Sequence, residues 1–186
     1  MARCVYYAAC TLDGYIATRD DDIEWLTGYR PAAAYDGEPM KGSYDEFFSR
    51  IGTLVMGSVT YEWVLEHVED WPYPESPTWV LSSRDLQRPP GDEADVRVVE
   101  AAITDIWEEL AAAAGDGAVW IVGGGGVASD FAEAGLLDEV IVTVVPVVLG
   151  EGKPLFDRPL PGGPMRLTGT HAWDTGMVEL RYEIDR

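Results

Sequence analysis

Apolar residues along the chain gather in short runs that alternate with polar segments rich in glycine and proline. Apolar runs of roughly four to eight residues bounded by turn residues are typical of buried strands. Strands are predicted over residues 3–11, 15–17, 53–56, 78–81, 96–99, 118–122 and 139–148, with a closing antiparallel pair over 167–173 and 177–184. The first run is apolar on both faces, which favours a central strand of a parallel sheet.

Segments with helical patterns separate these strands. Helices are predicted over residues 43–51, 59–67, 104–114 and 127–134. Ser43 and Thr104 are the predicted N-caps, because their side-chain oxygens can accept a hydrogen bond from a free backbone N–H group. Loops are predicted over 18–22, 29–42 and 71–77, of which 29–42 is read as a loop or lid. The alternation of strand and helix predicts one α/β domain over residues 1–186, with a mostly parallel, mixed sheet.

Charge and cysteine content restrict the partners and the compartment. The chain carries 13 Lys and Arg against 33 Asp and Glu, a net charge of −20, which disfavours nucleic acid and anionic membranes as partners. Cys4 and Cys10 lie about 20 Å apart along one predicted strand, too far for a disulfide. Free thiols, the lack of a signal-peptide pattern and the lack of a transmembrane run predict a cytoplasmic protein.

Three of the predicted strands end in segments suited to an anion. These segments are Gly57-Ser58-Val59-Thr60, Ser82-Ser83-Arg84 and the four glycines 123–126. Ligands of open α/β sheets bind beyond the carboxyl ends of the strands, and helix N-termini attract anions. Taken alone, the glycine run fits a plain tight turn equally well, and Ser82-Ser83-Arg84 fits a plain loop better. The glycine run matches neither the G-x-G-x-x-G nor the P-loop pattern. The combination of three such strand ends favours a dinucleotide site.

Five segments together resemble the dihydrofolate reductase superfamily, and more closely the bacterial branch similar to the RibD C-terminal reductase domain of riboflavin biosynthesis. They are AACTLDGYIA at 8–17, LVMGSVTYEWV at 54–64, WVLSS at 79–83, VWIVGGGGVASDF at 119–131 and VTVVPVVLGEGKPLF at 142–156. They occur in the order found in the family and span nearly the whole chain. The resemblance implies a dihydrofolate reductase-like three-layer α/β/α fold with an antiparallel C-terminal hairpin, and NADPH bound across the carboxyl edge of the sheet.

The resemblance also implies which residues contact the cofactor. The nicotinamide would contact Ala9 and Ile16, and the pyrophosphate and adenosine would contact Gly57, Ser58, Val59 and Thr60. The adenine ribose would lie among Leu81, Ser82, Ser83 and Arg84. The pyrophosphate would be faced from the other side by Val122, Gly123, Gly124, Gly125, Gly126 and Val127. A cis peptide is implied between Gly123 and Gly124. Ser58 stands where dihydrofolate reductases commonly have Arg, so Arg84 is expected to hold the 2′-phosphate, and the preference for NADPH over NADH stays open.

The substrate side carries fewer signals. By the resemblance, Asp45 is the expected proton donor, and Tyr7, Trp25, Tyr44, Phe48 and Thr143 are the expected substrate contacts. Asp45 equally fits an ordinary first-turn carboxylate, and the aromatic residues equally fit core packing. His67 and His171 are the only histidines, and neither a C-x-x-C nor an H-E-x-x-H motif occurs, so no metal site is expected.

The expected activity is an NADPH-dependent reduction of a small flat nitrogen heterocycle, similar to a pterin or a ribosylaminopyrimidine, as in riboflavin biosynthesis. The alternative is a non-catalytic dinucleotide-binding module on the same scaffold, since a fold alone does not establish function. A homodimer is expected, with the apolar run 142–150 and the C-terminal strands as the interface.

Overall fold

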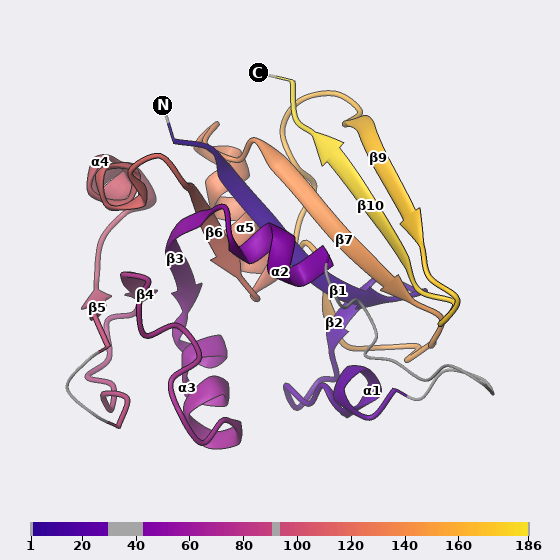
Figure 1. Ribbon diagram of the computed structural model, residues 1–186, viewed down its shortest axis with the longest axis horizontal. Coiled ribbons are helices and arrows are strands. Elements are labelled where there is room, and N and C mark those ends of the chain that lie inside the picture. Colours follow the sequence, from indigo (N-terminus) through magenta and orange to yellow (C-terminus); the bar gives the residue numbers. More distant parts are fainter. Residues whose placement is uncertain (1, 30–42, 91–93, 186) are drawn as a thin grey trace.

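A computed structural model describes residues 2–29, 43–90 and 94–185, and its main feature is an eight-stranded sheet. The strands lie in the order β5-β4-β3-β6-β1-β7-β10-β9, as Figure 1 shows. Their bounds are β1 Cys4–Thr11, β3 Ile51–Gly57, β4 Thr78–Leu81, β5 Val96–Val99, β6 Ala118–Val122, β7 Glu139–Val145, β9 Arg166–Ala172 and β10 Val178–Glu183. Neighbours from β5 to β7 are parallel, whereas β10 pairs antiparallel with both β7 and β9. The predicted mostly parallel, mixed sheet with an antiparallel C-terminal pair is confirmed.

Helices cover both faces of this sheet, which makes the domain three layers thick (Figure 1). The helices are α1 Glu24–Thr27, α2 Ser43–Phe48, α3 Ser58–His67, α4 Ile103–Ala114 and α5 Gly125–Glu133. Side chains of α4 and α5 pack on one face, and side chains of α2 and α3 pack on the other. Two short strands, β2 Tyr15–Ala17 and β8 Lys153–Pro154, form a separate antiparallel pair. None of the helices in the described ranges is both long and apolar enough to cross a bilayer.

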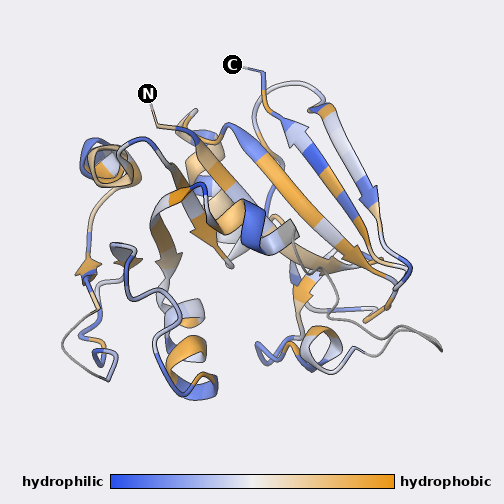
Figure 2. Cartoon of the chain, in the orientation of Figure 1, coloured by the Kyte–Doolittle hydropathy of each residue, from blue (hydrophilic) through white to orange (hydrophobic). Residues whose placement is uncertain are grey.

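Two apolar clusters, one on each face, form the core. Leu110 of α4 and Phe131 of α5 are fully buried against Tyr6 and Trp79 of the sheet. On the other face, Tyr61 of α3 packs with residues of α2, β1, β3 and β6. Figure 2 shows that β7 is mostly apolar, whereas most of the edge strand β9 is pale to blue. Cys4 and Cys10 are buried free thiols, so the prediction of no disulfide is confirmed.

Several predicted element boundaries need correction. The cap at Thr104 is wrong: α4 begins one residue earlier, and its N-cap, Ala102, supplies no side-chain hydrogen bond. The strand predicted to reach residue 148 ends at Val145, because the next residue, Pro146, has no N–H for the ladder. The helix predicted over 43–51 ends at Phe48.

Other boundaries shift or were not foreseen. The last predicted helix begins inside the glycine run, at Gly125 rather than at residue 127. The elements α1 and β8 were not predicted, since each is too short to leave a periodic signal. The predicted loop or lid over 29–42 lies almost wholly outside the described residues, as does the predicted cap side chain of Ser43.

The core assignment predicts a large loss of stability for Leu110→Ala. The side chain is fully buried, so its truncation removes apolar contacts and leaves a cavity, at an expected cost of about 2–5 kcal/mol in the free energy of unfolding. Urea denaturation measures the difference. The matched control is Leu167→Ala on β9, where the side chain is 52% exposed and the expected change is small. Equal losses in the two variants would contradict the assignment.

Candidate functional site

A cavity of about 510 Å³ lies at the carboxyl edge of the sheet, where the sequence predicts a ligand. Its wall draws on β1, β2, α1, α3, β8 and the segment between β6 and α5. The predicted site residues that line it are Tyr7, Ala9, Ile16, Val59, Thr60, Val122, Gly123, Gly124, Gly125 and Gly126. The lining residues that sequence reasoning missed include Ile23, Leu26, Trp63, Tyr73, Trp120, Lys153 and Asp157. The segments that follow β1, β3 and β6 are far apart in the chain and meet at one edge because these strands are parallel neighbours.

The four glycines meet distinct steric requirements. Gly123 and Gly124 adopt φ values of +62° and +59°, a region that side chains with a Cβ rarely occupy. A Cβ at Gly123 would lie 2.7 Å from Oγ1 of Thr60 on α3. A Cβ at Gly125 would lie 2.6 Å and 2.7 Å from the carbonyl oxygens of Pro154 and Leu155. The run is therefore wedged between α3 and the chain around β8.

The predicted cis peptide at this run is wrong. Every peptide bond within the described ranges is trans. Gly123 and Gly124 reverse the chain between β6 and α5 through their left-handed backbone conformation instead.

Two helix N-termini open toward this cavity. The N-cap positions of α3 and α5 are Gly57 and Gly124, and neither helix has a side-chain capping hydrogen bond. The two starts are close together, since a Cβ at Gly57 would lie 3.5 Å from Cγ2 of Val127. The first backbone N–H groups of a helix lack intrahelical partners and carry the positive end of the helix dipole. Together with the side-chain-free surface at Gly124, these groups fit an anion such as the pyrophosphate of a dinucleotide.

A neighbouring groove on the α3 side is acidic. Nη1 and Nη2 of Arg84 donate to Oε1 and Oε2 of Glu62, at 3.0 Å and 2.6 Å. The groove is also lined by the carboxylates of Asp20, Asp21, Asp22 and Glu66 and by the imidazole of His67. The groove and the cavity share Asp21, Val59 and Trp63 in their walls. Arg84, the predicted phosphate ligand, is therefore already paired and surrounded by carboxylates.

Other predicted cofactor residues stand back from the cavity wall. This group comprises Gly57, Ser58, Leu81, Ser82, Ser83 and Val127, and none of them is a lining residue. Ser82 instead closes a local turn, where its hydroxyl oxygen accepts the N–H of Arg84 at 3.0 Å. Gly57 and Val127 shape the site indirectly, because their contact brings the starts of α3 and α5 together.

An aromatic cluster forms another part of the wall of the 510 Å³ cavity. Tyr7, Tyr73 and Trp120 line the cavity. Behind them, the rings of Tyr44 and Phe48 stack with centroids 5.9 Å apart and planes only 9° apart. Burial is the main cause that raises the pKa of both Tyr44 and Tyr73, so both stay neutral phenols. This wall offers a flat, mostly apolar aromatic surface.

The expected proton donor does not lie at the cavity. Asp45 is exposed on α2 and is not a lining residue. Trp25 of α1, a predicted substrate contact, does not line the cavity either. Its indole N–H is buried and has no hydrogen-bond partner in the described part of the chain. The geometry therefore gives Asp45 no enclosed environment in which to act on a bound ligand.

Sequence reasoning missed a buried carboxylate on the same face of the sheet. Glu179 of β10 is 1% exposed and is the only acidic residue that is buried among residues 2–29, 43–90 and 94–185. Its Oε1 accepts Nε–H of Arg181 at 2.7 Å, and its Oε2 accepts the hydroxyl of Tyr7 at 3.4 Å. It lies directly opposite Thr143 of β7. The available signal was the alternation in VELRYE, which puts Glu179 and Arg181 on one face.

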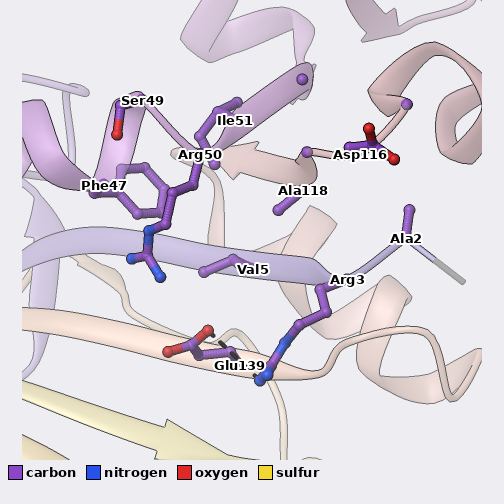
Figure 3. A pocket seen from close by; sticks show the side chains of 13 residues that line it. Ala2, Arg3, Val5, Phe47, Ser49, Arg50, Ile51, Asp116, Ala118 and Glu139 are labelled. Atoms are coloured by element: carbon purple, nitrogen blue, oxygen red, sulfur yellow. Dashed lines mark ion pairs between the residues drawn. The ribbon is translucent and has the colours of Figure 1, made fainter.

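A larger cavity, about 790 Å³, lies at the opposite edge of the sheet and is drawn in Figure 3. Arg3 and Arg50 share its wall with Asp116 and Glu139, and Arg3 pairs with Glu139 at 3.6 Å (Figure 3). It opens at the amino ends of β1, β3 and β6, away from the glycine run and the aromatic wall. Because open α/β sheets bind ligands at the carboxyl ends, the smaller cavity is the better candidate.

Comparisons with known proteins agree with this architecture. The family model of the RibD C-terminal domain matches residues 4–178. The "Uncharacterized protein YwjB" of Bacillus subtilis (strain 168) is 32% identical over 181 residues, 97% of each chain. The crystal structure of a "Putative riboflavin biosynthesis protein" from Shewanella sp. PV-4 aligns with a TM-score of 0.80, 30% identity and full coverage of both chains.

The fold is also that of a more distant enzyme. A dihydrofolate reductase from Enterococcus faecalis aligns with a TM-score of 0.60 at 19% identity, over 98% of this chain and 97% of that chain. The three-layer domain with a cavity at the carboxyl edge of its sheet thus has the dihydrofolate reductase-like fold. The chain belongs to the RibD C-terminal domain family.

The packing of the glycine run predicts that Gly125→Ala destabilises the protein. The new methyl group would overlap two backbone carbonyl oxygens, so α5 or the chain at β8 must shift, at a cost of about 1–3 kcal/mol. Urea denaturation measures the loss. Gly163→Ala is the control, since a Cβ there meets no atom within 4 Å. A Gly125→Ala protein as stable as this control would show that the run is not wedged.

Proposed function

We propose that this protein is an NAD(P)H-dependent reductase that transfers a hydride to a small, flat nitrogen heterocycle similar to a pterin or a ribosylaminopyrimidine. One observation carries the proposal: a single cavity joins two uncapped helix N-termini to an aromatic wall. The first part suits a pyrophosphate, and the second suits a flat ring. Its volume of about 510 Å³ is in the range of small-molecule sites, roughly 300–1,000 Å³.

The cofactor of this proposal is NADPH. The backbone N–H groups at the start of α5 and those near Val59 and Thr60 would hold its pyrophosphate. Ala9 and Ile16 would lie at the nicotinamide end, and the bound nicotinamide would supply the hydride. The solved structure of the fold neighbour from Enterococcus faecalis is a complex with NADP(H), which supports this choice.

The chain's own residues would bind, orient and shield the substrate. Tyr7, Tyr73 and Trp120 provide a ring-sized apolar wall, on which a flat heterocycle can stack. Such positioning brings donor and acceptor atoms together, and this contributes to the rate of any two-substrate reaction.

A non-catalytic dinucleotide-binding module is the alternative. The exposed position of Asp45 favours it, because the cavity lacks the acid that the resemblance implies. Oxidation of NADPH in the presence of candidate pterins and aminopyrimidines separates the two functions. A reductase consumes the cofactor when a substrate is added, whereas a binding module only binds it.

A homodimer and a cytoplasmic location belong to the same proposal. The predicted interface contains β7, β9 and β10. β7 is hydrogen-bonded to a strand on each side, so the strand with a free backbone edge in this group is β9. A solution mass near twice 20.4 kDa would support the dimer. Cys4 and Cys10 are buried free thiols, which suits a reducing compartment.

The pairing of Arg84 with Glu62 predicts how Glu62→Gln changes cofactor choice. The substitution weakens the ion pair and leaves the guanidinium free for a 2′-phosphate. Because exposed ion pairs contribute only about 0.2–1 kcal/mol, NADPH affinity should rise by no more than about fivefold, with NADH affinity unchanged. Quenching of tryptophan fluorescence measures both, and Trp63 in the cavity wall is a natural reporter.

Glu66→Gln is the matched control, because it removes the same charge from the same groove without touching the pair. Equal gains in both variants would mean that net groove charge, and not release of Arg84, limits NADPH binding. If the unmodified protein bound neither NADPH nor NADH, the proposed reductase function would be rejected.

A further inference from the structure

We propose that the ammonium of Lys153 binds the pyrophosphate of the dinucleotide and gives up its ion pair with Asp21 to do so. Lys153 stands on β8, in the wall of the 510 Å³ cavity. The inference rests on the proposed function for its ligand, a nicotinamide dinucleotide. It adds a cationic side chain to the backbone N–H groups of the site, since Arg84 lines only the neighbouring groove and is paired with Glu62.

The charged residues of the cavity wall provide one cation for an anionic ligand. Among the described residues that line the cavity, the charged ones are Asp21, Asp157 and Lys153. Nη1 of Arg158 donates to both carboxylate oxygens of Asp157, at 2.9 Å and 3.1 Å, which compensates the charge of Asp157. Lys153 is therefore the group of this wall that can neutralise a bound phosphate, and Asp21 competes for it.

Backbone contacts hold Lys153 beside the glycine run. In the pair of β2 and β8, Lys153 lies opposite Ala17, and a Cβ at Gly152 would overlap the carbonyl oxygen of Ala17. The carbonyl oxygen of Pro154, the next residue, lies 2.6 Å from the position of a Cβ at Gly125. Lys153 is thus one residue, about 3.8 Å along the chain, from the contact with the start of α5. Its flexible four-carbon stem lets the ammonium reach an anion held there.

The ion pair of Lys153 with Asp21 is loose enough to exchange. Nζ of Lys153 lies 3.7 Å from Oδ1 of Asp21, beyond the roughly 2.7–2.9 Å of a charge-assisted hydrogen bond. The two side chains are 48% and 40% exposed, and an exposed ion pair contributes little to stability. A pyrophosphate diester carries two negative charges, whereas Asp21 carries one. A bound dinucleotide can therefore displace the carboxylate from the ammonium.

The backbone at Asp21 makes a clean test of this competition possible. Asp21 has a φ of +63° and is the only residue other than glycine with a positive φ in the described ranges. Its N–H donates to the carbonyl oxygen of Thr18 at 3.2 Å. Aspartate and asparagine adopt this left-handed conformation more readily than most residues. Asp21→Asn therefore removes the charge and keeps the turn.

The first test measures the affinity of Lys153→Met and Asp21→Asn for NADPH, NADH and ADP-ribose by quenching of tryptophan fluorescence. All three ligands contain the pyrophosphate, but only NADPH has a 2′-phosphate, and ADP-ribose lacks the nicotinamide. Lys153→Met removes the charge and keeps an unbranched side chain, so it should weaken all three ligands by the same factor, about ten- to hundredfold. Asp21→Asn removes the competing carboxylate and should strengthen all three about two- to fivefold.

Arg19→Gln is the matched control for net charge. Arg19 joins the same two chain segments through an ion pair with Glu151 at 2.7 Å, but neither of these residues lines the cavity. The substitution removes one positive charge, as Lys153→Met does. The affinities for the three ligands should stay within about twofold of those of the unmodified protein.

A labelling experiment tests the same contact in the unmodified protein, in case Lys153→Met does not fold. The amino group of Lys153 is half-exposed, so acetic anhydride can acetylate it. Mass spectrometry of the peptide that contains Lys153 follows the reaction. Bound ADP-ribose should slow the acetylation of Lys153, because the pyrophosphate covers the ammonium.

The outcomes separate this inference from the proposed function. Equal losses for the three ligands in Lys153→Met, with unchanged affinities in Arg19→Gln, support it. It is overturned by unchanged affinities in Lys153→Met, by a loss for NADPH alone, by a loss that spares ADP-ribose or by an equal loss in Arg19→Gln. Unchanged affinities in Asp21→Asn or an unprotected Lys153 would overturn it as well. Failure of the unmodified protein to bind either NADPH or NADH would instead reject the proposed function.

Discussion

The site depends on one close contact, in which the backbone at residues 123–126 lies against α3 on one side and the chain at β8 on the other. At Gly123 and Gly125 the neighbouring atoms leave no room for a Cβ. This contact brings the starts of α3 and α5 together and leaves their first N–H groups without side-chain caps. Both helices thus keep free donors at one cavity, which is the arrangement that an anionic ligand requires.

The local electrostatics of this site differ from those of the whole chain. A net charge of −20 repels an anion at long range, and the groove beside α3 adds several carboxylates. N–H groups that point at a bound anion act strongly on it at contact distance. Salt largely screens the interaction of exposed charges that lie more than about 10 Å from the anion. A dinucleotide can therefore bind through its pyrophosphate to an acidic protein, while a phosphate at Arg84 must compete with Glu62.

The buried carboxylate on this face of the sheet is carried by a strand rather than by a helix. The carboxylate of Asp45 is exposed on α2, whereas that of Glu179 lies in the sheet and is held by Arg181 and Tyr7. A carboxylate inside a sheet is expensive to bury and is held in place by the hydrogen bonds that it accepts.

The sequence by itself determined the layer architecture and the edge at which the ligand site lies. Continuous apolar runs such as CVYYAAC require cover on both faces, and strand ends at Gly57 and Gly123 mark one edge of a parallel sheet. These patterns involve neighbouring residues in the sequence, so they can be recognised without knowing the tertiary contacts. The start of α4 was missed because Ala102 gives no capping signal, and α1 and β8 because they are too short for a period.

Only the tertiary structure decided which of the candidate residues work together. Arg84 is a free cation in the sequence, but folding places Glu62, 22 residues away, against its guanidinium. Glu179 looks like an ordinary surface position, but folding buries it beside Tyr7, 172 residues away in the chain. Such pairings depend on strand order and register. No local pattern specifies these, because they are set by how all the strands pack at once.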